Sequence, residues 1–136
     1  MVDEHIQRKT VNNVVTNILI HSSVLLFQSI LDYDIKSINS IIESILMCNN
    51  ITKDTTTYVS NNYLFSFYNI IYDSYSLFVK SYKHKKYCNK LLHNIIISSR
   101  KLMNIITKIV DNESELYRSA IISYEEIIQR CNYLKI

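Results

Sequence analysis

The chain has 136 residues, a formal net charge of +3, and neither glycine nor proline. Without glycine, no residue adopts a positive backbone φ at low cost, which disfavours tight hairpins, barrels and sandwiches. The P-loop and the dinucleotide-binding fingerprint are excluded as well, because both need glycine beside phosphate. An apolar content of 48% suits one globular domain, 1–136, with its own core. The sequence therefore predicts an all-α fold.

The first third of the chain predicts two helical segments and a loop. Apolar residues recur at helical spacing from Asp3 to about Leu31, either as one helix or as two that meet near His21–Ser23. A further helix is predicted over Asp34–Met47, with Asp34 as its N-cap. Cys48–Thr57 is rich in asparagine and threonine, which predicts a loop.

An aromatic helix is predicted next, from a cap at Ser60 or Asn61 to about Val79, and the basic segment Lys80–Lys86 connects it to the following helix. Its stripe consists of Phe65, Tyr68, Ile71, Tyr72, Tyr75 and Phe78. Tyrosine combines an apolar ring with a polar hydroxyl. Part of the stripe therefore suits the wall of a groove, although a place in the core is the simpler interpretation for any single residue.

The stretch Tyr87–Val110 predicts the central helix of the fold, because its apolar residues cover most of the helix circumference. Lysine and arginine residues interrupt it, so it is not a membrane span. Ser98 and Ser99 are small and allow a neighbouring helix to approach closely. Asp111–Glu115 predicts a turn, in which Asn112 and Glu115 have the spacing of a capping box, and the last helix runs to about Asn132.

The connection before the central helix is strongly basic, and it contains Lys80, Lys83, His84, Lys85, Lys86 and Lys90. Cations at the start of a helix oppose its macrodipole. This unfavourable placement indicates an acidic partner, with a merely solvated connection as the alternative. Nucleic acid is disfavoured, because the basic residues do not form an extended stripe.

Catalytic and metal-binding patterns are weak. His84 and Cys88 share a helix face, but zinc needs three or four ligands. A Cys88 nucleophile has no visible group to orient its base. The odd number of cysteines, three, suggests a reducing compartment. We therefore expect no enzymatic activity, no metal and no cofactor, and an enzyme that uses Cys88 is the remote alternative.

The segment Ser76–Leu92, SLFVKSYKHKKYCNKLL, resembles the first homology motif of the Bcl-2 family, in which E-L-F precedes four residues, N-W-G-R and an apolar helix. Leu77 and Phe78 correspond to L-F, and Lys86 falls at the position of the Arg. Lys85 replaces the motif's Gly, and Lys86 lacks the bidentate fork of Arg. The residues from Leu91 to Tyr133 are similar in pattern to the second half of a myxoma-type poxviral Bcl-2-like inhibitor of apoptosis. The whole resemblance covers about the second half of the chain, Tyr63–Tyr133.

This resemblance implies a Bcl-2-like helical bundle with a hydrophobic groove beside the central helix. The groove would bind the amphipathic BH3 helix of host pro-apoptotic proteins of the Bim, Bax and Bak type. A basic residue at the start of the central helix would meet the ligand's aspartate. The candidate groove residues are Ile38, Ile41, Ile42 and Ile45 on one wall, Tyr68, Tyr72, Tyr75 and Leu77 on the other, Leu91 and Leu92 on the floor, and Lys85 and Lys86 as the charge partners.

A second function remains open within the same resemblance, namely a poxviral Bcl-2-fold protein that inhibits host NF-kappa-B signalling through a surface rather than a groove. In either case the expected protein is a monomer or a domain-swapped dimer that binds no nucleic acid. Its expected location is the host cytoplasm, or the mitochondrial outer membrane if the natural chain carries a C-terminal anchor.

Overall fold

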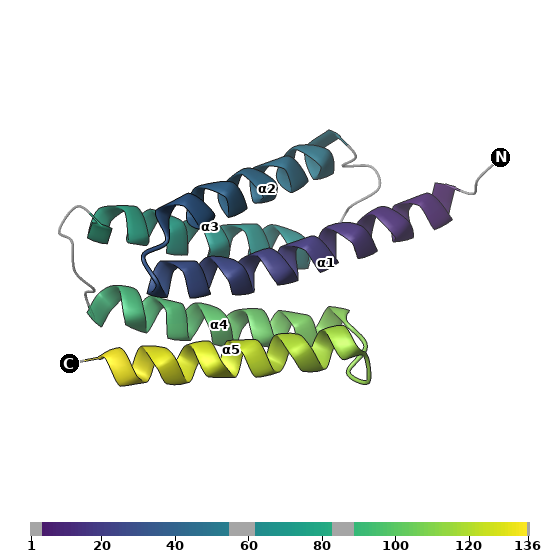
Figure 1. Ribbon diagram of the computed structural model, residues 1–136. Helices are drawn as coiled ribbons and strands as arrows, with labels where there is room; N and C mark the ends of the chain where they lie inside the picture. Colours follow the sequence, from purple (N-terminus) through teal and green to yellow (C-terminus); the bar gives the residue numbers. More distant parts are fainter. Residues whose placement is uncertain (1–3, 55–61, 83–88, 136) are drawn as a thin grey trace.

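The computed structural model describes residues 4–54, 62–82 and 89–135, and every regular element within them is an α-helix (Figure 1). The prediction of an all-α fold is therefore confirmed. The five helices are α1 (Glu4–Leu31), α2 (Ile35–Asp54), α3 (Asn62–Tyr82), α4 (Asn89–Ile109) and α5 (Glu115–Leu134).

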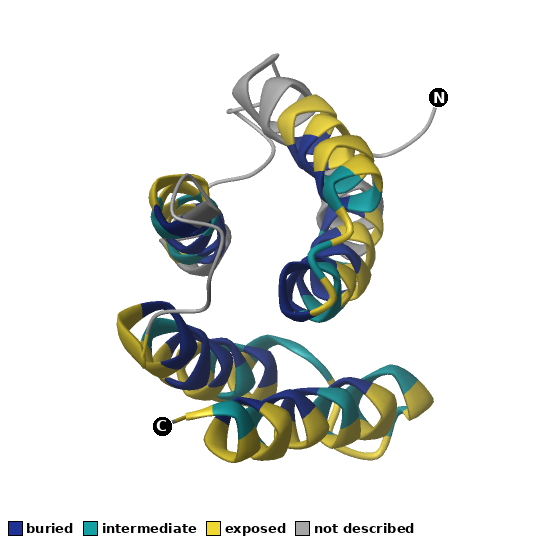
Figure 2. Cartoon of the chain, turned by 60° about the vertical axis from the view of Figure 1, so that its left-hand side comes forward, coloured by how far each residue is buried: buried dark blue, intermediate teal, exposed yellow. Residues whose placement is uncertain are grey.

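The helices form one bundle around a shared apolar core. α1 packs against α2, α3 and α5, whereas α4 packs chiefly against α3 and α5. Figure 2 shows that the buried residues lie on the sides that the helices turn toward one another, and that exposed residues line the outside. The fully buried side chains include Leu19, Leu26, Phe27 and Ile30 of α1, Ile45 of α2, Phe67 and Ile71 of α3, Leu91, Ile95 and Ile106 of α4, and Tyr124 of α5.

The helix expected at the centre, 87–110, corresponds to α4 but is buried along only part of its circumference. Its core side carries Leu91, Ile95 and Leu102, while Lys90 and Lys101 are exposed on the opposite side. The most broadly packed helix is instead α1, which adjoins α2, α3 and α5. The charged residues of α4 explain the difference, because an unpaired lysine is almost never fully buried.

α1 is a single helix, so the predicted weak point near His21–Ser23 does not break it. Ser23 is fully buried, and its hydroxyl donates a hydrogen bond to the carbonyl oxygen of Ile20, 2.9 Å away. Within the described residues, Val14–Leu31 is long and apolar enough to cross a membrane, with a mean hydropathy of 1.7. Half of this stretch is buried inside the bundle, as is typical of a core helix.

The turn between α1 and α2 has a backbone hydrogen-bond pattern in which one residue is left-handed, and this residue is usually glycine. The amide of Asp34 donates to the carbonyl of Ser29 (3.0 Å), and the amide of Tyr33 donates to that of Ile30 (3.1 Å). These two bonds form a Schellman motif, in which the first residue after the C-cap of the helix has a left-handed backbone conformation. Tyr33 takes this role with φ 54°, in a chain that contains no glycine.

The predicted N-cap of α2 is confirmed. The carboxylate of Asp34 accepts a hydrogen bond from the Ser37 hydroxyl (2.7 Å) and another from the Ser37 amide (3.2 Å). The second bond satisfies one of the free amides at the start of the helix. These two bonds hold the pKa of Asp34 below its ordinary value, and the bond from the Ser37 hydroxyl has the larger effect.

Three predicted helix boundaries were wrong, namely the end of α2, the end of α3 and the cap of α5. Cys48–Asp54 continues α2 instead of forming a loop, because asparagine and threonine are only mildly unfavourable in a helix and Cys48 is buried on the core side. Lys80–Tyr82 belongs to α3, where the Ser81 hydroxyl donates to the carbonyl of Leu77 at 2.9 Å. The predicted caps at Ser60 and Asn61 lie outside the described residues.

The cap of α5 is the third boundary that differs from the prediction. Ser114 is the N-cap, and its side chain accepts a hydrogen bond from the amide of Tyr117 at 3.2 Å. Asn112 and Glu115 therefore do not form a capping box, because Glu115 is already the first residue of the helix. Ser114 supplies the acceptor for a free amide of the first turn, which is the role expected of Asn112.

The close approach predicted at Ser98 and Ser99 is confirmed. Both serines are buried, and the hydroxyls of Ser98 and Ser74 are 3.1 Å apart where α4 meets α3. Ser74 also donates to the carbonyl of Ile70 at 2.9 Å, so the shared proton comes from Ser98. Small side chains thus bring α3 and α4 together.

Candidate functional site

The ten described candidate groove residues all belong to the apolar cluster of the core, but they differ in depth. Six are buried, namely Ile38, Ile42, Ile45, Tyr68, Leu91 and Leu92. Four are partly buried and pack against the cluster, namely Ile41, Tyr72, Tyr75 and Leu77. The fold therefore brings residues from α2, α3 and α4 into one cluster.

The expected floor of the groove is covered by the protein's own side chains. Leu91 and Leu92 are 0% and 1% exposed, and Ile45 of the first wall is 0% exposed. A ligand helix reaches these residues only if a neighbouring helix moves away. The groove is therefore closed at its floor in this structure.

The second wall is more accessible, because α3 presents part of its aromatic stripe at the edge of the core. Tyr72, Tyr75 and Leu77 are half-buried, whereas Tyr68 is buried. The rings of Tyr68 and Tyr72 stack with their centroids 6.4 Å apart and their planes at 16°. Phe67, which the predicted stripe omitted, is also buried, because the core side of α3 is centred closer to Phe67 and Ile71 than the aromatic spacing indicated.

The charge partners Lys85 and Lys86 lie outside the described residues. The described residues that flank them include Ser81, which is buried near the end of α3, and Lys90, which is exposed in the first turn of α4. Cys88 and His84 also lie outside, so the weak metal and nucleophile patterns are not placed.

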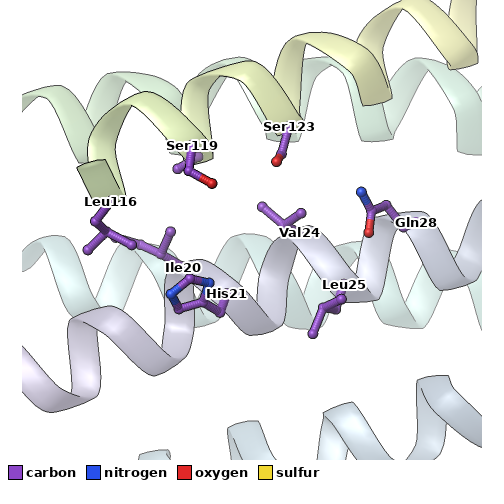
Figure 3. Close-up of a pocket in the computed structure, with 9 residues that line it drawn as sticks. Ile20, His21, Val24, Leu25, Gln28, Leu116, Ser119 and Ser123 are labelled. Atoms are coloured by element: carbon purple, nitrogen blue, oxygen red, sulfur yellow. The ribbon is translucent and has the colours of Figure 1, made fainter. Parts of the chain in front are cut away.

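Two surface pockets of the described structure adjoin α1. The first, with a volume of about 260 Å³, lies between α1 and α5 (Figure 3). It combines polar side chains with apolar ones, and its lining residues are Ile20, His21, Val24, Leu25, Gln28, Leu116, Ser119, Ala120 and Ser123. In Figure 3, Ser119 and Ser123 of α5 point toward the α1 residue Val24.

The second pocket, of about 340 Å³, lies between α1 and α2. Ile41 lines it together with Leu25 and Ser29 of α1, so this candidate groove residue adjoins α1. Leu25 borders both pockets and is 51% exposed. Sequence reasoning missed both pockets, because an apolar residue at helical spacing predicts a core position whether or not a neighbouring helix covers it.

The described cysteines are not activated for chemistry. Cys48 and Cys131 are free and buried. Burial raises the pKa of the Cys48 thiol, and it raises the pKa of Cys131 to about 11 despite the nearby positive charges of Arg130 and Lys135. Both thiols are therefore protonated at neutral pH, and the protonated thiol is a poor nucleophile.

Comparison with known proteins gives no match, neither to a family model, nor to a curated protein, nor to a solved structure. The class of protein that the fold itself defines is an all-α helical bundle.

Proposed function

We propose that this chain is a Bcl-2-like viral protein that binds the BH3 helices of host pro-apoptotic proteins. The observation that carries the proposal is the segment Ser76–Leu92, which resembles the first homology motif of that family. The all-α bundle is consistent with the family fold. The segment also runs from the aromatic helix α3 to the start of α4, where the apolar residues Leu91 and Leu92 enter the common core.

Binding of a BH3 helix in the groove requires an opening movement, because the floor residues Leu91 and Leu92 are buried. α2 packs chiefly on α1, and α3 packs chiefly on α4, whereas α2 and α3 pack little on each other. A movement that widens the space between the α1–α2 pair and the α3–α4 pair therefore lets each helix keep its main partner. Apolar residues of the ligand, spaced at i, i+3, i+4 and i+7, would then cover the apolar side chains that the opening exposes on the two walls. Because only the open form gives the ligand access to the buried residues of the groove, the observed affinity is reduced in proportion to the fraction of molecules that are open.

The half-buried residues of α3 provide the first binding surface. Tyr72, Tyr75 and Leu77 lie at the edge of the core before any opening. A tyrosine at such an edge packs its ring against the ligand while its hydroxyl stays near water. The ligand's aspartate then pairs with Lys86, and Lys85 is the second choice for this role.

The test is a calorimetric titration of the protein with a panel of BH3 peptides. Lys86→Glu is expected to weaken binding by about 2–5 kcal/mol if the charge pair is shielded from water. Lys36→Glu on α2, which changes the net charge equally, is the control and is expected to bind almost as well as the wild type. Unchanged affinity of the Lys86 variant would remove this residue from the role, and the absence of binding to every peptide would reject the proposal.

The alternative function, inhibition of NF-kappa-B signalling through an outer surface, is favoured by one observation. The floor residues Leu91 and Leu92 are buried by the protein itself, and a surface interaction needs no opening. Failure to bind any BH3 peptide, together with reduced activity of an NF-kappa-B reporter in cells that express the chain, would support this alternative. Micromolar or tighter binding of a BH3 peptide would support the groove.

A further inference from the structure

The charges of the chain are distributed very unevenly along the sequence. Ser74–Val110 contains eight lysine or arginine residues and no aspartate or glutamate, whereas the other residues contain seven basic and twelve acidic side chains. The 37 residues of this segment thus carry a formal charge of +8, and the remainder carries −5. Such an asymmetry indicates an anionic partner rather than a uniformly solvated surface.

The described part of this segment places much of the positive charge on the outer side of α4. Lys90, Arg100, Lys101 and Lys108 are all exposed. Lys90 and Lys108 are five helical turns apart, so the row of cations extends over about 27 Å. Lys90, Arg100 and Lys101 form no ion pair with another described residue, whereas Arg130 of α5 pairs with Asp32.

An isoleucine lies within this row of cations. Ile97 is 37% exposed, and it precedes Lys101 by four residues and follows Lys90 by seven, so it shares their side of the helix. The phosphate backbone of a nucleic acid and the carboxylates of an acidic peptide offer the side chain of Ile97 no apolar contact. At a bilayer surface it gains apolar packing, because the acyl region begins directly below the charged headgroups.

We propose that the basic face of α4, defined as Lys90, Ile97, Arg100, Lys101 and Lys108, binds the surface of an anionic phospholipid membrane. The cations attract the headgroups, and Ile97 enters the boundary between headgroups and acyl chains. The remainder of the chain, with its charge of −5, is repelled and turns away from the bilayer. This proposal is independent of BH3 binding.

The first experiment is sedimentation of the protein with lipid vesicles. We expect binding to phosphatidylcholine vesicles that contain about 30% phosphatidylserine, and little binding to pure phosphatidylcholine. Raising the salt from about 50 to about 300 mM should weaken the binding, because salt screens exposed charges. Absence of binding to the anionic vesicles, or equal binding to both kinds, would overturn the proposal.

The second experiment compares matched variants. One lysine or arginine near an anionic surface strengthens membrane partitioning about fivefold, which corresponds to about 1 kcal/mol. Lys101→Glu changes the charge by two units, so it is expected to weaken vesicle binding about 25-fold. Lys36→Glu on α2 changes the net charge equally and lies outside the basic face, so it should have much less effect. Equal losses would show that net charge alone governs binding, and this would overturn the assignment to α4.

The apolar part of the face is tested in the same assay with Ile97→Ser and with Ile122→Ser, which changes an exposed isoleucine of α5. Only the first is expected to weaken vesicle binding, and equal effects would remove Ile97 from the proposed face. Far-ultraviolet circular dichroism verifies that each variant keeps the helical fold.

Tighter binding of the wild type to duplex DNA or to polyglutamate than to anionic vesicles would overturn the choice of a membrane as the partner.

Discussion

Among the described residues, Tyr124 is the largest side chain that the core buries completely. Its hydroxyl is hydrogen-bonded to that of Ser23 on α1, and its ring lies 6.5 Å from the ring of Phe27, centroid to centroid. Because the Ser23 hydroxyl donates to the carbonyl of Ile20, Tyr124 donates to Ser23. Burial raises the pKa of Tyr124, so this proton stays in place at physiological pH.

The two partners of this hydrogen bond are expected to respond differently to mutation. Tyr124→Phe should lower the free energy of unfolding by about 1 kcal/mol, because Ser23 keeps its bond to Ile20. Ser23→Ala should lower it by about 1–3 kcal/mol, because the buried hydroxyl of Tyr124 is left without an acceptor. Urea unfolding followed by circular dichroism measures both values. A larger loss for Tyr124→Phe than for Ser23→Ala would contradict this account.

At the scale of the helix, the turn between α1 and α2 contains the clearest pH-dependent group. The pKa of Asp34 is lower in the folded chain than its ordinary value of 3.8, because the ionised carboxylate accepts two hydrogen bonds from Ser37. A carboxyl group whose pKa is lowered by folding stabilises the fold above its unfolded pKa. This stabilisation is lost as the pH falls through the folded-state pKa.

Asp34→Asn provides the test of this cap, because asparagine caps helices about as well as aspartate but does not titrate. We expect the variant to lose less stability than the wild type as the pH is lowered from above 3.8 to below the folded-state pKa. Thermal unfolding at a series of pH values measures the difference. The control is Glu43→Gln, an exposed carboxyl in the middle of α2. Parallel pH profiles for the wild type and Asp34→Asn would contradict the proposed role.

The helix boundaries show which local signals are reliable in this chain. Asp34 was predictable as a cap because an aspartate three residues before Ser37 provides the acceptor within a single turn. The extension of α2 beyond Cys48 was not predictable from local composition, since burial of Cys48 against other helices decides it. Tyr33 was also unexpected at positive φ, because that conformation normally selects glycine or asparagine.

At the scale of the whole molecule, α1 connects the parts of the bundle. It packs against α2, α3 and α5, and its residues Leu19, Leu26, Phe27 and Ile30 are completely buried. A change in this helix therefore affects three interfaces. We infer that the described helices unfold together, as small single domains usually do.

Leu26→Ala tests this inference, because Leu26 is 0% exposed. The substitution should lower the free energy of unfolding by about 2–5 kcal/mol, because apolar packing is removed and a cavity remains. Helix loss by circular dichroism and tyrosine fluorescence should give coincident transitions in both the wild type and the variant. Leu25→Ala, at an exposed neighbouring position, is the control and should have a much smaller effect. Separate transitions would show that α1 does not unite the bundle.

The candidate site was predictable only in part. Helical periodicity identified the apolar residues of α2, α3 and α4, and all ten described members belong to one cluster. Periodicity does not state which neighbouring helix covers each residue. The complete covering of Leu91 and Leu92, which were expected to form the floor of an accessible groove, was therefore not foreseen. The pockets beside Leu25 were missed for the same reason, because exposure depends on which neighbouring helix covers a residue.

The sequence by itself determined the all-α class, the Asp34 cap and the close approach at Ser98. The class follows from the absence of glycine and proline along the whole chain, and the other two follow from the residue types at a few positions. Only the tertiary structure decided that α1 is the most broadly packed helix, that α4 keeps one side exposed, and that its cations share that side with Ile97. These features arise from packing between segments far apart in the chain, and burial is set by those distant partners rather than by local pattern.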